Sequence, residues 1–313
     1  MIPSPSSSIR RALLAGRTVL LALGAVLSAG SAASLSAQDA PLRLFVSVDM
    51  EGIGGVGTPA MTSSSGKDYA TSRRLATDEV NAVVAAIFAR DPDAEILVND
   101  SHGDHQNLLH TELDARVTYI QGSIKPLGMV QGLDGSFDGA LFIGYHARAG
   151  DPDGFLAHTG TGSVKGLWLN DVEVGEGGMN AAFAGSHGVP VILATGDEVA
   201  TRELDDLLGA ETVTTKVAET PSSARLVHPD VVHERLRAGV DRALDRLAAG
   251  GFEPLDPGEP VRIRMRFDST THVEILQSIP GMTKVDGFTV AYTARDADEA
   301  YRLIRLMYRF VGV

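Results

Sequence analysis

The sequence has 313 residues, of which 44% are hydrophobic and 21% are charged, an ordinary globular composition that suffices for one large domain or two smaller ones. Asp and Glu total 40 against 27 Lys and Arg, so the formal net charge is −13. A surface this acidic argues against nucleic acid or an anionic membrane as the main partner. Because the sequence contains no cysteine, disulfides are excluded and any metal site must use His, Asp and Glu.

The first 37 residues have the pattern of a signal peptide. Three arginines precede an apolar run at 18–30, and the small residues that follow offer cleavage after Ala33 or Ala37. The run is shorter than the ~20 apolar residues that a membrane span needs. We therefore expect residues 1–37 to be removed on export. The mature protein would then act in the periplasm or outside the cell, with no attachment to the membrane.

Short apolar segments alternate with segments of helical periodicity over residues 42–220. The expected strands are 42–48, 95–98, 117–120, 140–143 and 189–193. The expected helices are 68–90, 177–188 and 196–209, the last with Asp197 as its N-cap. Strand–helix alternation predicts an α/β domain whose mainly parallel sheet is flanked by helices. This domain is the expected catalytic and metal-binding part of the chain.

A smaller α+β unit is expected over residues 221–313. It begins with a long helix at 229–249, after which a Pro- and Gly-rich linker leads to a strand at 261–267. That strand alternates apolar and basic residues, which is typical of a sheet with one solvated face. A strand at 287–294 and a closing helix at 296–311 complete the unit.

Metal-ligand residue types follow three of the expected strands. Asp49 and Glu51 come directly after the first strand, Asp100 and His102 after the second, and His146 after the strand at 140–143. In open α/β sheets functional groups gather at the carboxyl ends of the strands. One acid at a strand end is usually a turn residue or a helix cap, but three such ends together favour a shared site.

Two further candidates lie in glycine-rich segments, His158 in "AHTGTG" and Glu176 in "VGEGG". Imidazole and carboxylate without thiolate are the donors of catalytic rather than structural zinc sites. One carboxylate can also bridge two metal ions about 3.5–4 Å apart. The joint pattern predicts a metal hydrolase. The glycine-rich loop "GIGGVG" looks like a phosphate-binding loop. However, it lacks the G-x-G-x-x-G spacing, and the two acids before it would repel a pyrophosphate.

These residues lie in six motifs that together resemble the zinc D-aminopeptidases of the DppA type. The motifs are "SVDMEGIGG", "VNDSHG", "GALFIGYHARAG", "AHTGTGSV", "LNDVEVGEGGMNA" and "VILATGD". They occur in the family's order with similar spacings, and the resemblance runs from about residue 42 to the C-terminus. Six motifs in register are far more specific than any single one.

The resemblance implies a two-zinc aminopeptidase that removes N-terminal D-amino acids, typically D-alanine, from short peptides. The residues that it assigns are Asp49 as the bridge between two zinc ions, Glu51, His102, His146 and Glu176 as further ligands, and His158 as the catalytic histidine. It also implies a ring-like homo-oligomer, such as a decamer. Two alternatives stay open: another metal-dependent aminopeptidase or amidase acting on cell-wall fragments, and a non-catalytic exported protein that binds peptides.

Overall fold

The computed structural model describes residues 40–311 of the chain. The expected signal peptide, residues 1–37, lies outside the described residues. Within residues 40–311, every helix falls short of the length or the apolar character that crossing a membrane requires.

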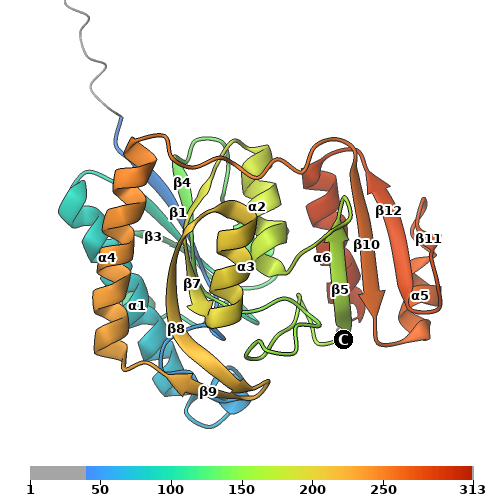
Figure 1. Cartoon of the computed structure of the whole chain (residues 1–313), viewed down its shortest axis with the longest axis horizontal. Helices are drawn as coiled ribbons and strands as arrows, with labels where there is room; N and C mark the ends of the chain where they lie inside the picture. Colours follow the sequence, from blue (N-terminus) through green and yellow to red (C-terminus); the bar gives the residue numbers. More distant parts are fainter. Residues whose placement is uncertain (1–39, 312–313) are drawn as a thin grey trace, which may run out of the picture. The chain divides into compact units, whose positions relative to one another are not determined.

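The larger sheet is mainly parallel (Figure 1). Its seven strands lie in the order β3-β2-β1-β4-β7-β8-β9, and each neighbouring pair is parallel except the β8–β9 hairpin. The strands are β1 (Arg43–Val48), β2 (Glu95–Asp100), β3 (Thr118–Ile120), β4 (Gly139–Tyr145), β7 (Val191–Asp197), β8 (Glu211–Thr220) and β9 (Ser223–Leu226). The expected α/β class is confirmed.

Helices cover both faces of this sheet because alternate side chains of its strands point to opposite sides. Leu44 and Val46 of β1 join a buried cluster with α1 (Tyr69–Arg90) and α4 (Pro229–Ala248). Phe45, between them, joins the other cluster, to which α2 (Glu176–Ser186) and α3 (Glu198–Leu208) contribute. Asp197 caps α3 as expected, accepting a hydrogen bond from the Val199 N–H at 3.3 Å.

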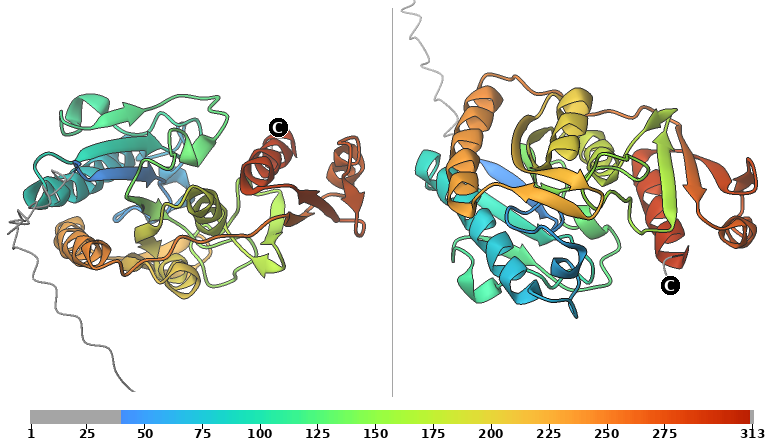
Figure 2. Two further views of the ribbon diagram at one scale, coloured as in Figure 1. Left: turned by 90° about the horizontal axis from the view of Figure 1, so that it is seen from above. Right: turned by 60° about the horizontal axis from the view of Figure 1, so that its bottom comes forward.

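A second, antiparallel sheet has the strand order β11-β12-β10-β5-β6. Its strands are β5 (Val164–Leu169), β6 (Val172–Glu173), β10 (Val261–Phe267), β11 (Thr283–Lys284) and β12 (Thr289–Ala294). Helix α5 (Thr270–Leu276) packs on β10 and β12. Helix α6 (Ala297–Val311) lies between this sheet and α2, which places it beside the larger sheet's carboxyl edge (Figure 2). Three short 3-10 helices occupy loops: η1 (Pro59–Met61), η2 (His110–Glu112) and η3 (Gly128–Val130).

The two sheets do not divide the chain at residue 221, where sequence analysis begins the smaller unit. That position lies in the turn of the β8–β9 hairpin, and α4 packs on α1 and the larger sheet. Conversely, β5 and β6 come before residue 221 but belong to the second sheet, since β5 pairs with β10. The order of elements along the chain cannot indicate that β5 and β6 belong to the second sheet, because β5 joins that sheet by pairing with a strand almost a hundred residues away.

Candidate metal centre

Three of the predicted site residues follow neighbouring parallel strands. Asp49 directly follows β1, His102 comes two residues after β2, and His146 directly follows β4. The strand order β2-β1-β4 brings these three ends to one edge of the sheet. The sheet therefore places the residues where the sequence pattern predicts a shared site.

The other predicted residues reach the same edge from loops and a helix. Glu51 lies in the loop after β1, Glu176 is the first residue of α2, and His158 lies in the loop between β4 and β5. Asp100, the remaining acid at a strand end, accepts two backbone hydrogen bonds from the following loop at 2.6 and 2.9 Å. It therefore orders the loop that carries His102 and is not part of the centre.

Glycine follows the two acids after β1 because this loop passes against the backbone of β4. The Gly52 N–H donates a hydrogen bond to the Gly144 carbonyl at 2.8 Å. A Cβ at position 52 would lie only 2.0 Å from the Tyr145 carbonyl oxygen, so no other residue type fits without moving the backbone. The close approach fixes the loop that carries Asp49 and Glu51.

His102 has one ring nitrogen held by the backbone and the other facing carboxylates. Its Nε2–H donates to the Thr62 carbonyl at 2.7 Å. Its Nδ1 lies 3.1 Å from Asp49 Oδ1 and 3.0 Å from Glu51 Oε2. With the proton on Nε2, the Nδ1 lone pair faces two anionic oxygens. This arrangement is repulsive unless a proton on Nδ1 or a metal ion lies between the three atoms.

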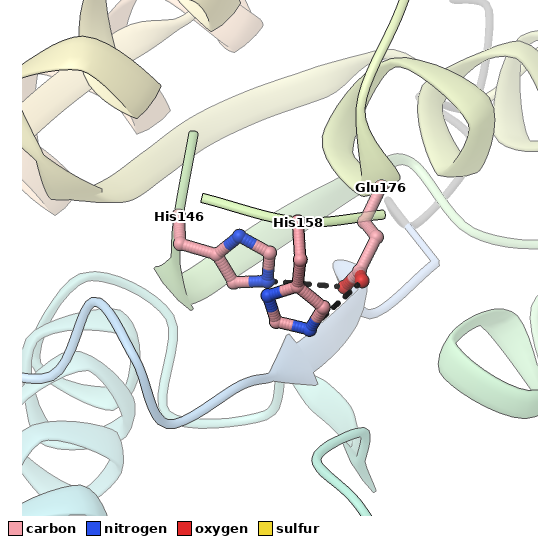
Figure 3. A group of neighbouring side chains, drawn as sticks. All are labelled: His146, His158 and Glu176. Atoms are coloured by element: carbon pink, nitrogen blue, oxygen red, sulfur yellow. Dashed lines mark ion pairs between the residues drawn. The ribbon is translucent and has the colours of Figure 1, made fainter. Parts of the chain in front are cut away.

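His146 and His158 repeat the arrangement around Glu176 (Figure 3). Each donates its Nδ1–H to a backbone carbonyl at 2.9 Å. Nε2 of His146 then lies 3.4 Å from Asp49 Oδ2 and 3.5 Å from Glu176 Oε2, and Nε2 of His158 lies 3.6 Å from Glu176 Oε1. The two rings stack with centroids 4.1 Å apart. All three imidazoles therefore point one ring nitrogen, which carries a proton or is free to bind a metal ion, at the same group of carboxylates.

Three buried atoms at this centre have no hydrogen-bond partner: Asp49 Oδ2, Glu51 Oε2 and His146 Nε2. Leaving buried polar atoms unpartnered is costly, and a bound cation would satisfy all three. Ligand atoms of Asp49, Glu51 and His146 lie within 4.8 Å of one another, as do those of His146, His158 and Glu176. Oxygen and imidazole donors without sulfur match a catalytic zinc site. The residues fit the metal that the sequence resemblance implies.

The pKa values show how strongly this centre attracts positive charge. Burial raises the pKa of Glu51, but protonated His102 outweighs it and holds that pKa well below its usual range. Burial lowers the pKa of His102 and His146, yet the carboxylates of Glu51 and Glu176 raise both pKa values well above the usual one. Burial also raises the pKa of Glu176, but protonated His146 outweighs burial and lowers that pKa to about 2. Binding a metal ion would release the protons on these imidazoles.

Two buried residues that the sequence pattern does not predict hold the loop after β1. Lys216 of β8 is fully buried, and its ammonium donates to the carbonyls of Glu51 and Val56. Glu79 of α1, also buried, accepts a hydrogen bond from the Gly54 N–H at 2.5 Å. The signals available in the sequence were a lysine inside a strand and an acid on the apolar face of a helix. Neither indicates which loop the side chain reaches.

A cavity of about 150 Å³ opens onto the centre. Four of the predicted site residues line it, Asp49, His102, His158 and Glu176. A larger cavity of about 290 Å³ lies nearby, but His146 is the one predicted site residue in its wall. The smaller cavity is therefore the better candidate for the substrate pocket. The His158 side chain is 29% exposed against 1% for His146, so His158 is the more accessible of the two.

Comparison with known proteins gives a consistent result. The family model Peptidase_M55, described as D-aminopeptidase, matches residues 42–306. The D-aminopeptidase of Bacillus subtilis (strain 168) is 34% identical over 268 residues, which cover 85% of this chain and 96% of that protein. The solved structure of the Zn-dependent D-aminopeptidase DppA from Bacillus subtilis, described as a self-compartmentalizing protease, has a TM-score of 0.82 at 34% identity. The match covers 86% of this chain and 97% of that one.

Proposed function

Because the chain belongs to the Peptidase_M55 family of D-aminopeptidases, it is a hydrolase of peptide bonds, and we propose that it removes N-terminal D-alanine from short peptides outside the cytoplasm, using two zinc ions. Membership confirms the resemblance drawn from the six sequence motifs and sets aside a non-catalytic role. The observation that carries the proposal is the convergence of three imidazole ring nitrogens on three buried carboxylates.

The two-ion count is supported by the position of Asp49. Its Oδ1 lies beside His102 and its Oδ2 beside His146, so one carboxylate faces both histidines. The two groups of possible ligands overlap at His146. Three carboxylates carry a charge of −3, and one divalent cation would neutralise only part of it. Asp49 would bridge the two ions, with Glu51 and His102 on one side and His146 and Glu176 on the other.

When bound, zinc polarises the scissile carbonyl and lowers the pKa of a coordinated water toward ~7. The chain's own contribution to proton transfer would come from His158. Its Nδ1–H is held by the backbone, so protons are taken up and released at Nε2. Glu176 Oε1, 3.6 Å from that atom, would stabilise the protonated ring. Since His158 is partly exposed and lines the pocket, it can donate the proton to the leaving amine.

Stereoselectivity is tested with D-Ala-Gly and L-Ala-Gly, which differ at a single centre. We expect the zinc-loaded enzyme to hydrolyse the D peptide at least about tenfold faster in kcat/KM, a typical discrimination for one side-chain contact. A chelator should abolish the activity. N-acetyl-D-Ala-Gly, which lacks the free amine, should be inert. Faster cleavage of the L peptide would contradict the D specificity, and cleavage of the acetylated peptide or of N-acylated cell-wall fragments alone would favour the amidase alternative.

We also propose that the protein is exported. The support is the pattern of residues 1–37, with a basic segment, an apolar run and small residues at the expected cleavage positions. D-alanyl peptides from cell-wall turnover would be the substrates available there.

A ring-like homo-oligomer, such as a decamer, is proposed as the assembly. The support is that the solved DppA structure is described as self-compartmentalizing.

Expression of the full chain followed by cell fractionation tests export and assembly together. We expect the processed protein outside the cytoplasm, with a new N-terminus at Ser34 or Gln38, and a light-scattering mass near ten protomers. An unprocessed N-terminus in the cytoplasm would contradict export. A monomeric mass for the zinc-loaded, active enzyme would contradict the ring.

A further inference from the structure

Two groups of residues with opposite chemistry line the substrate pocket. At the metal centre its wall consists of carboxylates and imidazoles. Helix α6 contributes Arg305, Tyr308 and Arg309 to the same wall. No motif in the sequence points to these three residues, and the last two lie beyond residue 306, where the family match ends.

Arg305 is a buried cation without a counter-ion. The residue is 5% exposed. Its guanidinium donates to the carbonyls of Pro126 at 3.2 Å and Lys125 at 2.9 Å, and to the Tyr308 hydroxyl at 2.7 Å. All three acceptors are neutral, and no carboxylate among residues 40–311 forms an ion pair with it. Two of its five N–H groups remain without a protein acceptor. A buried charge in this state is costly until an anion arrives.

Tyr308 adds a neutral donor beside that guanidinium. Its oxygen accepts the hydrogen bond from Arg305, so its own proton is free for another acceptor. Burial raises the pKa of Tyr308 to about 12, and the hydroxyl stays protonated at neutral pH. The ring lies against Gly160, where an added Cβ would be 2.6 Å from ring atoms. Gly160 in turn donates its N–H to Glu176, which ties Tyr308 to the metal centre.

Arg309 places a second guanidinium at the pocket. It is exposed, and its Nη2 donates to the carbonyl of Gly103 at 3.4 Å. Gly103 directly follows His102, so this cation also lies beside the loop of a predicted metal ligand. Like Arg305, it has no ion-pair partner in the described part of the chain. Two guanidinium groups and one hydroxyl thus offer donors to an anion in the pocket.

We propose that Arg305, Tyr308 and Arg309 bind the C-terminal carboxylate of the substrate, so that the enzyme acts on dipeptides with a free C-terminus. The inference rests on the proposed aminopeptidase function, which places the scissile bond at the metal centre. Arg binds carboxylate with paired, charge-assisted hydrogen bonds. In a dipeptide the carboxylate lies one residue, roughly 3.5 Å of extended chain, beyond that bond. A cavity of about 150 Å³ also suits so small a ligand, since pockets for larger molecules exceed roughly 300 Å³.

The test compares D-Ala-Gly with its amide, D-Ala-Gly-NH2, in the zinc-loaded enzyme. We expect kcat/KM for the acid to exceed that for the amide by at least about tenfold, as for the loss of one hydrogen-bonded charge, with most of the difference in KM. In Arg309→Gln and Tyr308→Phe this ratio should fall toward one. Arg305→Gln should have the same effect, but the first two variants remain informative if it fails to fold. Arg302→Gln, on the exposed side of α6 and paired with Asp298, is the matched control and should keep the ratio.

The outcomes separate this inference from the proposed function. If wild-type enzyme cleaves acid and amide equally, or if the Arg309 and Tyr308 variants keep the full ratio, the carboxylate site is wrong while the aminopeptidase stands. If Arg302→Gln loses the acid-to-amide ratio of kcat/KM to the same extent, the carboxylate site is also wrong, since the loss would indicate a general effect of the charge on helix α6. If neither peptide is cleaved, the proposed function fails. In that case, calorimetry measures the affinity of the zinc-loaded protein for the two peptides. Tighter binding of the acid would support the carboxylate site, and equal affinity would contradict it.

Discussion

Asp49→Ala protein is expected to lose both zinc ions and at least about a hundredfold in kcat/KM. Changes in residues that merely support a metal ligand typically cost 10–100-fold in metal affinity, and a bridging ligand should cost more. Asp49 supplies one oxygen toward His102 and the other toward His146, so its removal affects both halves of the centre. Metal content by mass spectrometry and hydrolysis of D-Ala-Gly measure the two effects.

The Asp49→Ala protein should still fold, because the change removes one of several mutually repelling buried carboxylates and leaves the loop held by Lys216. Circular dichroism checks this point. Asp104→Ala is a matched control: Asp104 is an exposed acid on the loop that carries His102 and lies outside the centre. It should retain zinc and activity. Full zinc content in the Asp49→Ala protein would show that the centre is assigned to the wrong residues.

His158→Ala is expected to retain zinc while kcat falls by about 10²–10⁴-fold, the range for a general acid or base. The physical reason is its position. The His158 side chain is 29% exposed in the pocket wall, whereas His146 is 1% exposed and has an unpartnered Nε2 at the centre. His146→Ala should therefore lose zinc, in contrast to His158→Ala.

His187→Ala, which removes an exposed histidine after α2, is the control for the loss of an imidazole elsewhere and should be fully active. The geometry also allows the opposite result for His158, because its ring nitrogen lies within ligand distance of His146 and Glu176. Loss of one zinc equivalent in His158→Ala would make the residue a ligand. Full turnover with full zinc would remove it from the mechanism.

The local parts of this structure follow from the sequence. An apolar run ending in two acids and glycine predicts a buried strand that stops at a functional edge, and Asp49, Glu51 and Gly52 lie there. His102 and His146 likewise come directly after, or two residues after, short apolar strands. Since parallel strands share one carboxyl edge, residue type and strand position place Asp49, His102 and His146 at the same edge of the sheet.

The order of the strands and the supporting residues were decided by the tertiary structure. Nothing near Lys216 in the sequence indicates that its ammonium holds the loop of Glu51, and nothing near Val164 indicates that β5 pairs with β10. The same holds for Arg305 on α6, whose charge lacks a counter-ion only because of how the helix packs.

The sequence by itself therefore determined the α/β class, the family and the six residues of the candidate metal centre, because periodicity, strand ends and motifs are local properties. Only the tertiary structure decided which strands share a sheet, how each histidine is oriented by a backbone carbonyl, and that α6 supplies cations to the pocket. These features depend on contacts between segments far apart in the chain, whose free energies come from burial and hydrogen bonding in three dimensions and leave no local pattern.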